Sequence, residues 1–277
     1  MGFRINTNTT SQAAQRALSK VTAKSENLSS QLATGSRINK SADDAAGLAI
    51  SEKLKANIRS NQQANRNAND GISMIQVAEG GLNETGNILI RLRELAIQSA
   101  SDTVGDTERS YTDLEYQQLK QEIGRISETT EFNGVSLLNG EGDQLDFQVG
   151  ANNDDFKDRI QYDSGKINAG LDGLGMSGEG VASKEDAQSS LEAIDGAINS
   201  VSGQRAELGA LQNRLQTTSA NLETSVENMS AANSRIRDVD FAKATAENAQ
   251  NNILKQAGTS VLAQANQMPA QALRLVG

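Results

Sequence analysis

Residues 208–239 read LGALQNRLQTTSANLETSVENMSAANSRIRDV, and this stretch decides the fold. Apolar or small residues recur in it at alternating spacings of three and four, without a slip. The positions are Leu208, Leu211, Leu215, Thr218, Leu222, Ser225, Met229, Ala232, Ile236 and Val239. Such a repeat places these side chains on one face of an α-helix, where a second helix can pack against them. The stretch therefore predicts a long helix with a coiled-coil seam.

Similar spacing occurs near both ends of the chain. The N-terminal seam is interrupted by Thr34-Gly35-Ser36 and consists of Ser11, Ala14, Leu18, Val21, Ser25, Leu28 and Leu32. After Val239 the C-terminal seam shifts register and continues through Ile253, Leu254, Ala257, Val261 and Ala265 to Leu273. Many inward positions are small or polar, so a single copy buries too little apolar surface to offset the entropy of ordering both ends. We expect the two ends to pair and to become rigid only on assembly. The residues assigned to this assembly seam are Leu18, Val21, Leu28, Leu32, Leu222, Met229, Ile236 and Val261.

Helical patterning also fills most of the chain between these ends. A second helix is expected to begin near Ser41, with Asp43 and Asp44 in its first turn, and to run to about residue 101. Gly80-Gly81 predicts a kink or local break within it. A further helix is expected over 108–129, and helical patterning resumes at Ser183.

Residues 132–180 have a different, turn-rich texture. Apolar and polar residues alternate strictly over 145–149 and 158–162, which predicts a β-hairpin around a polar loop. The fold class is therefore mainly α, with coiled-coil pairing of the two ends and a small β-hairpin region. We expect an inner terminal domain made of 1–43 and 234–277, and a helical rod domain made of 44–233.

The amino-acid composition argues against several classes of function. The chain has 277 residues, no histidine, no cysteine and 3% aromatic residues. Without histidine there are no Ser-His-Asp triads and no imidazole metal sites, so we expect neither an enzyme nor a metal protein. Residues 173–178 match the glycine spacing of dinucleotide-binding turns but lack a preceding strand and a following helix, so we expect no cofactor. The net charge of −9 disfavours nucleic acid, and no apolar run is long enough to span a membrane.

Several short segments resemble bacterial flagellin, in the same order along nearly the whole chain. They are Phe3-Arg4-Ile5-Asn6-Thr7-Asn8, 32–39 (LATGSRIN), 42–50 (ADDAAGLAI), 69–73 (NDGIS), 91–96 (RLRELA), Phe132-Asn133-Gly134, 234–240 (SRIRDVD) and 262–267 (LAQANQ). Each segment alone is weakly specific, but their number and order identify the chain as a member of this family.

The resemblance implies an architecture and a function. The two chain ends would form an inner coiled-coil layer of an extracellular flagellar filament that serves swimming motility. The short turn-rich region implies that the outer domains of larger flagellins are absent. The family also implies type III export, an export chaperone at the C-terminal helix, and cap and hook-junction proteins as partners. A hook-filament junction protein is the alternative within this class. Flagellin with a protease insert and a soluble coiled-coil effector are the alternatives outside it.

The resemblance also implies one receptor contact. Arg91, Glu94, Leu95 and Gln98 match the family segment that engages vertebrate Toll-like receptor 5, and Glu115 matches a further contact position on the next helix. Arg91, Leu95 and Gln98 have i, i+4, i+7 spacing and so share one stripe of a helix. The competing interpretation is that this stripe serves contacts between subunits, and one surface can do both if only shed monomers expose it.

Overall fold

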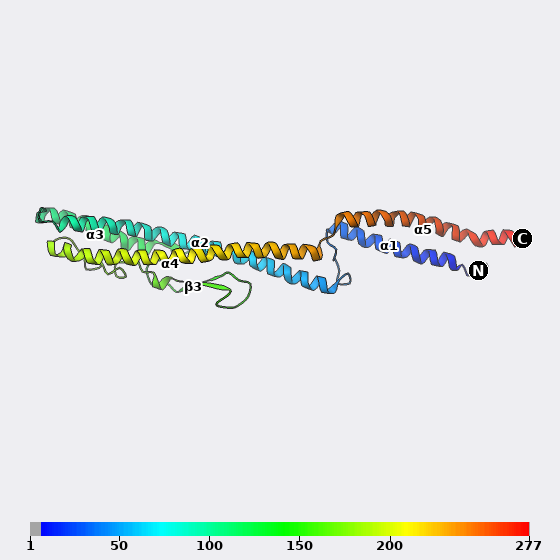
Figure 1. Ribbon diagram of the computed structural model, residues 1–277, viewed down its shortest axis with the longest axis horizontal. Helices are drawn as coiled ribbons and strands as arrows, with labels where there is room; N and C mark the ends of the chain where they lie inside the picture. The colour runs from blue at the N-terminus through cyan, green and yellow to red at the C-terminus, as the bar shows by residue number, and fades with distance from the viewer. Residues whose placement is uncertain (1–6, 277) are drawn as a thin grey trace. The chain divides into compact units, whose positions relative to one another are not determined.

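The computed structural model describes residues 7–276, and the side chains of residues 7–269 (Figure 1). The Phe3–Asn6 part of the flagellin-like start and the Leu273 side chain lie outside this range. The helices are α1 (Thr9–Thr34), α2 (Ala45–Ser99), α3 (Asp106–Thr129), the short 3-10 helix η1 (Ser164–Lys166), α4 (Lys184–Arg237) and α5 (Phe241–Val276). The strands are β1 (Glu131–Phe132), β2 (Val135–Ser136), β3 (Gln144–Gln148) and β4 (Arg159–Asp163). The predicted fold class, mainly α with a small β-hairpin region, is confirmed.

The chain forms two compact units. Residues 57–227 make up the central unit, and the described residues before and after them make up the terminal unit. The division at residues 43 and 234 that the sequence suggested stays a prediction.

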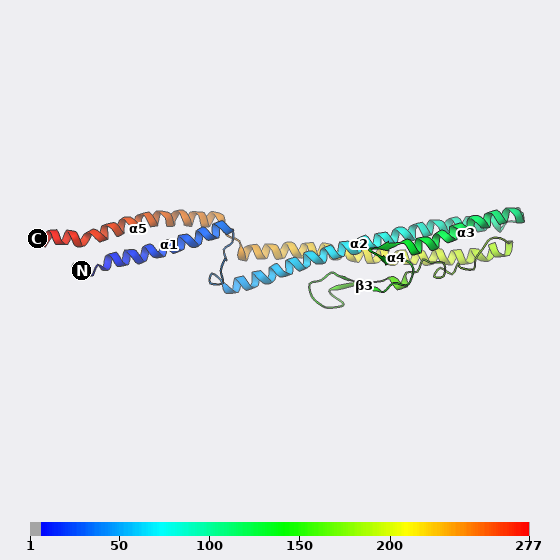
Figure 2. The ribbon, with the colours of Figure 1, turned by 180° about the vertical axis from the view of Figure 1, so that it is seen from behind.

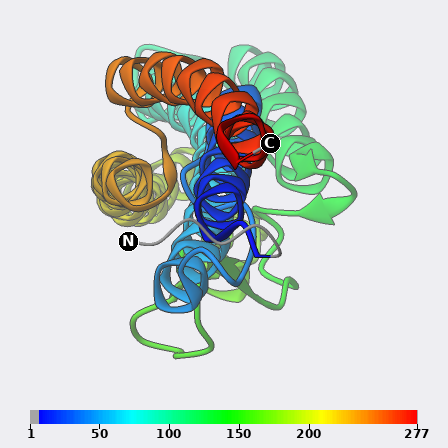
Figure 3. The ribbon, with the colours of Figure 1, turned by 90° about the vertical axis from the view of Figure 1, so that its right-hand side faces the viewer.

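In the terminal unit, α1 and α5 lie side by side and run antiparallel (Figures 1 and 3). Near one end of the pair, the side-chain amide of Asn8 donates to the carbonyl of Ala265 at 2.8 Å. At the other end, the backbone N–H of Arg37 donates to the carbonyl of Arg237 at 2.6 Å. The predicted pairing of the two chain ends is therefore confirmed.

The second helix begins later than its sequence pattern predicts. It starts at Ala45, because the Asp44 carboxylate accepts a hydrogen bond from the backbone N–H of Gly47 at 2.8 Å and so caps the helix. The Asp43 carboxylate accepts hydrogen bonds from the backbone N–H groups of Asn39 and Lys40, in the turn before the helix. The prediction that both aspartates lie within the first helical turn is wrong.

The C-terminal helical region is divided in two. The helix α4 ends at Arg237 and α5 begins at Phe241, so the register shift predicted after Val239 is a break between helices. Within the break, the backbone N–H of Val239 donates to the carbonyl of Gly35 at 3.0 Å. The interruption predicted around Gly35 is confirmed, since α1 ends there with a φ of 69°.

In the central unit, α2, α3 and α4 run side by side around the hydrophobic core (Figures 1 and 2). The helix α2 continues through Gly80-Gly81, so the predicted local break is wrong. A Cβ on Gly81 would lie 2.6 Å from Cδ1 of Leu138. This glycine is therefore explained by the close approach of the segment after α3.

The predicted hairpin is confirmed as the antiparallel pair β3–β4, with Leu145 opposite Tyr162 and Phe147 opposite Ile160. It packs on α2 through Phe147, whose ring atoms lie about 3 Å from the position of a Cβ on Gly71. A second, shorter hairpin, β1–β2, was not predicted as strands. Its turn is Asn133-Gly134, where both residues have positive φ, as two-residue hairpin turns require.

Candidate subunit-contact surfaces

The seam between α1 and α5 pairs large side chains with small ones. Leu18, Val21 and Leu32 of α1 are half-buried and Leu28 is buried, as the predicted N-terminal seam requires. The facing side of α5 consists of Ala244, Asn251, Gly258, Leu262 and Ala265, none of them exposed. A Cβ on Gly258 would lie 3.2 Å from Cδ1 of Leu18, so the glycine leaves space for that leucine.

Ala265 of the predicted C-terminal seam faces α1, but the larger seam residues before it are turned toward solvent. Ile253 and Val261 are 67% and 55% exposed, and Leu254 and Met268 are exposed as well. We call these four residues the outer stripe of α5. Ile253, Leu254 and Val261 of the predicted seam therefore do not face α1 within one copy, and the role of Val261 in the assembly seam stays a prediction. Sequence periodicity shows that two apolar faces exist, but it does not show which one faces α1.

The terminal unit has little interior. Its buried apolar side chains among the described residues are Leu28, Ile38, Ala244 and Ala265. Asn251 is also buried in the seam, and its side-chain nitrogen lacks a hydrogen-bond partner. Such a seam contributes little free energy against the entropy of ordering two long helices. In the single chain the outer stripe of α5 is not covered, so its apolar side chains add little to the stability of the terminal unit.

The remaining seam residues lie on α4. Leu208, Leu211 and Leu215 belong to the core of the central unit, but Leu222, Met229 and Ile236 are only half-buried. The heptad pattern thus continues along the helix while the depth of burial decreases. Leu222, Met229 and Ile236 keep part of their apolar surface open to solvent.

Three of the predicted receptor-contact residues form one cluster of charges. The Arg91 guanidinium donates to the Glu115 carboxylate from Nε at 3.0 Å and from Nη2 at 2.8 Å. It also donates to the Glu94 carboxylate at 2.8 Å. The hydrogen bonds to Glu115 and then to Glu94 raise the pKa of Arg91 above its ordinary value. The cluster is exposed and links α2 to α3, so it offers a fixed arrangement of charges to a partner.

The other two predicted residues have different environments. Gln98 is exposed, but Leu95 is only 2% exposed and belongs to the hydrophobic core. The stripe through Arg91, Leu95 and Gln98 therefore crosses the edge of the core, and the Leu95 side chain cannot be touched by a partner in this conformation. Sequence reasoning also missed Ile90 and Ile97, two exposed apolar residues on α2 whose i, i+7 spacing is visible in the sequence.

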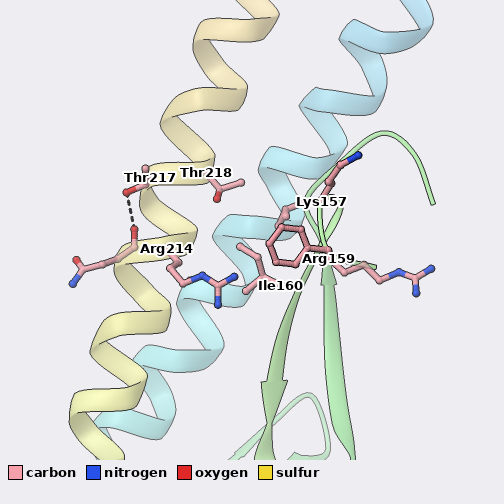
Figure 4. Close-up of a pocket in the computed structure, with 9 residues that line it drawn as sticks. Lys157, Arg159, Ile160, Arg214, Thr217 and Thr218 are labelled. Carbon is pink, nitrogen blue, oxygen red and sulfur yellow. Dashed lines mark hydrogen bonds between the residues drawn. The ribbon is translucent and has the colours of Figure 1, made fainter. Parts of the chain in front are cut away.

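A third surface lies where the β3–β4 loop faces α4. It is a cleft of about 410 Å³ lined by Val149, Phe156, Lys157, Arg159, Ile160, Asn213, Arg214, Thr217 and Thr218. Arg214 extends from α4 toward Ile160, whereas the Arg159 side chain extends away from α4 (Figure 4). The lining includes three cationic side chains and no carboxylate. The sequence predicted the loop but gave no sign of this cleft.

Neither a metal centre nor a membrane span is found in the described part of the chain. Residues 7–276 contain no group of three or more Asp or Glu side chains placed to hold a metal ion, and no helix long and apolar enough to cross a bilayer. The three surfaces above are suited to contact with other macromolecules.

Comparison with known proteins gives the family of these helices. A family model described as the bacterial flagellin N-terminal helical region matches residues 5–143. A second model, described as the bacterial flagellin C-terminal helical region, matches residues 191–276.

Similar full-length proteins and one similar structure carry the same description. The chain is 47% identical to a flagellin of Halalkalibacterium halodurans, over 89% of each chain. It is 41% identical to a flagellin of Bacillus subtilis, over 99% of this chain and all of the relative. The crystal structure of Bacillus cereus flagellin superposes with a TM-score of 0.51 at 30% identity and covers 61% of this chain and 94% of that one.

Proposed function

Because this chain belongs to the bacterial flagellin family, we propose that neighbouring copies in the filament cover the outer stripe of α5 and so make the terminal unit rigid. The chain is a structural subunit of the bacterial flagellar filament, the extracellular polymer that serves swimming motility. A role as a hook-filament junction protein is not better supported, since the relatives compared above are flagellins.

The proposal rests on the distribution of apolar surface in the terminal unit. Its own seam buries few apolar side chains, whereas Ile253, Leu254, Val261 and Met268 are open to solvent on one side of α5. Each Å² of apolar surface that is removed from water stabilises the assembled state by about 25 cal/mol. Contact between copies therefore supplies stabilisation that one chain cannot provide for itself. The half-buried Leu222, Met229 and Ile236 of α4 would contribute to the same assembly seam.

Hydrogen exchange tests this proposal. In dilute monomer, the amides of α1 and α5 should exchange quickly, while those of α3 in the central unit are protected. In filaments grown from seeds, α1 and α5 should become protected, and α3 should change little. Protection of α1 and α5 in dilute monomer equal to that in the filament would show that a single copy is already rigid, and the proposal would fail.

The same outer stripe suits the partners that act before and during assembly. An export chaperone that covers Ile253 and Val261 would keep the stripe from associating too early, and cap and hook-junction proteins would meet it as growth begins and proceeds. Purified chaperone should then protect α5 and leave α3 unchanged in hydrogen exchange. A chaperone that protects only the central unit would contradict this assignment.

We further assign the Arg91 cluster, with Glu94, Glu115 and Gln98, to contact with vertebrate Toll-like receptor 5 on shed monomers. Leu95 acts from the core, by holding α2 in place. Arg91→Ala should lower receptor activation by depolymerised protein at least tenfold, while the free energy of unfolding changes little because the ion pairs are exposed. Unchanged activation in receptor-reporter cells would remove Arg91 from the contact. A structural role in the filament requires no catalytic site, which agrees with the absence of histidine from the sequence.

A further inference from the structure

Phe156 is the most exposed large apolar side chain in the described part of the chain, at 91%. It lies in the loop between β3 and β4, at the mouth of the cleft against α4. Aromatic residues are scarce here, with five phenylalanines, three tyrosines and no tryptophan in 277 residues. Aromatic side chains, phenylalanine among them, are enriched at protein–protein interfaces.

The loop that carries Phe156 is held in place by its own side chains. The Asp154 carboxylate accepts hydrogen bonds from the backbone N–H groups of Phe156 and Lys157, at 3.1 and 3.0 Å. The buried Asp158 carboxylate accepts from the backbone N–H groups of Asn152 and Asp154, at 3.3 and 3.1 Å. A loop already fixed in this way loses little conformational entropy when a partner binds, so its exposed ring is ready to act as an anchor.

Two of the three cations that line the cleft have an ion-pair partner in the same loop, and Arg214 does not. Lys157 lies 3.6 Å from the Asp154 carboxylate, and the Arg159 guanidinium donates to Asp155. Arg214 makes no ion pair and no side-chain hydrogen bond among the described residues. Its side chain extends toward the apolar side chain of Ile160 in the cleft (Figure 4). An unpaired guanidinium next to apolar surface suits a carboxylate supplied by a partner.

We propose that Phe156 and Arg214 together form a docking surface for a second copy of this chain, in which the ring enters an apolar recess and the guanidinium meets a carboxylate. The inference rests on the function proposed above, since it assigns one contact of the filament. Charge favours a second copy as the occupant, because the chain carries 35 acidic and 26 basic residues.

The test compares critical concentrations for seeded polymerisation. Phe156→Ser should raise the critical concentration about 30-fold, as loss of an interface anchor does. Phe156→Leu should restore most of the assembly, and Gln161→Ser, an exposed change on the same hairpin, should have no effect. Arg214→Glu should raise the critical concentration by at least tenfold. The melting temperature of the monomer should stay the same in every variant, which separates assembly from folding.

A photocrosslinker placed at residue 156 identifies the occupant directly. Phe156→p-benzoylphenylalanine should give covalent dimers of the chain in illuminated filaments and none in dilute monomer. Wild-type assembly by Phe156→Ser, or crosslinks only to a different protein, would overturn this inference and leave the function proposed for the outer stripe of α5 intact. Failure of the wild-type chain to polymerise would overturn both.

Discussion

Truncating Ile253 should weaken the filament while leaving the monomer unchanged. Replacement by alanine removes three carbons, each worth about 0.8 kcal/mol when fully transferred from water into an apolar interface. The side chain is 67% exposed in the single copy, so roughly two thirds of that value, about 1.6 kcal/mol, is available to assembly. This difference corresponds to an approximately 15-fold rise in the critical concentration.

The assay is sedimentation of filaments grown from seeds over a series of protein concentrations. Val261→Ala provides an internal scale, because it removes two carbons from a side chain that is 55% exposed and should raise the critical concentration about fivefold. Asn252→Ala is the matched control on another side of α5 and should leave the critical concentration unchanged. Alanine favours helix at all three positions, so loss of helix is not a competing cause.

Two results would refute this reasoning. If Ile253→Ala and Asn252→Ala had equal critical concentrations, the outer stripe of α5 would be exposed to solvent in the filament and not buried between copies. If instead Ile253→Ala lowered the helix content of dilute monomer, the side chain would already be buried in a single copy, against the exposure described above.

Four further substitutions and a pH series test the central unit by urea unfolding. Leu95→Ala should lower the free energy of unfolding by about 2–5 kcal/mol, because the leucine is in the core, and a change within about 0.5 kcal/mol would place it on the surface. Gly81→Ala should cost about 1–3 kcal/mol through its close approach, whereas Gly80→Ala, with open space around it, should be neutral or stabilising. Burial raises the pKa of Tyr116 and of Tyr162 from 10.0 to about 12. The unfolded chain therefore ionises first, and stability should fall between pH 10 and 12 by up to about 3 kcal/mol per tyrosine. Tyr116→Phe should remove its share of this fall, and an identical pH profile would contradict the assignment.

Much of the fold is local information that the sequence carries. Heptad spacing identifies the helices, the strict alternation over 145–149 and 158–162 identifies the hairpin, and Gly35 marks the end of α1. The predictions that failed are those in which a residue type has more than one physical explanation. Gly81 is compatible with a break in the helix or with a close neighbour, and only the continuous α2 with Leu138 against it decides between the two.

The candidate surfaces depended on the tertiary structure to a greater degree. The sequence grouped Arg91, Glu94 and Glu115 through a family resemblance, and the antiparallel packing of α2 on α3 brings their charges together. Leu95 was grouped with them by helical spacing, but its burial follows from the neighbouring helices, which no spacing within α2 reveals. The cleft beside Phe156 joins residues more than fifty positions apart in the chain and has no signature in either segment.

The sequence by itself determined that long helices form and that apolar faces run along them, because a period of 3.5 residues is a property of one segment. The tertiary structure decided which of two faces of α5 meets α1, because that choice depends on whether the bulk of Leu18 fits against Ile253 or against Gly258. Gly258 leaves the space, so the outer stripe of α5 remains available to other copies of the chain.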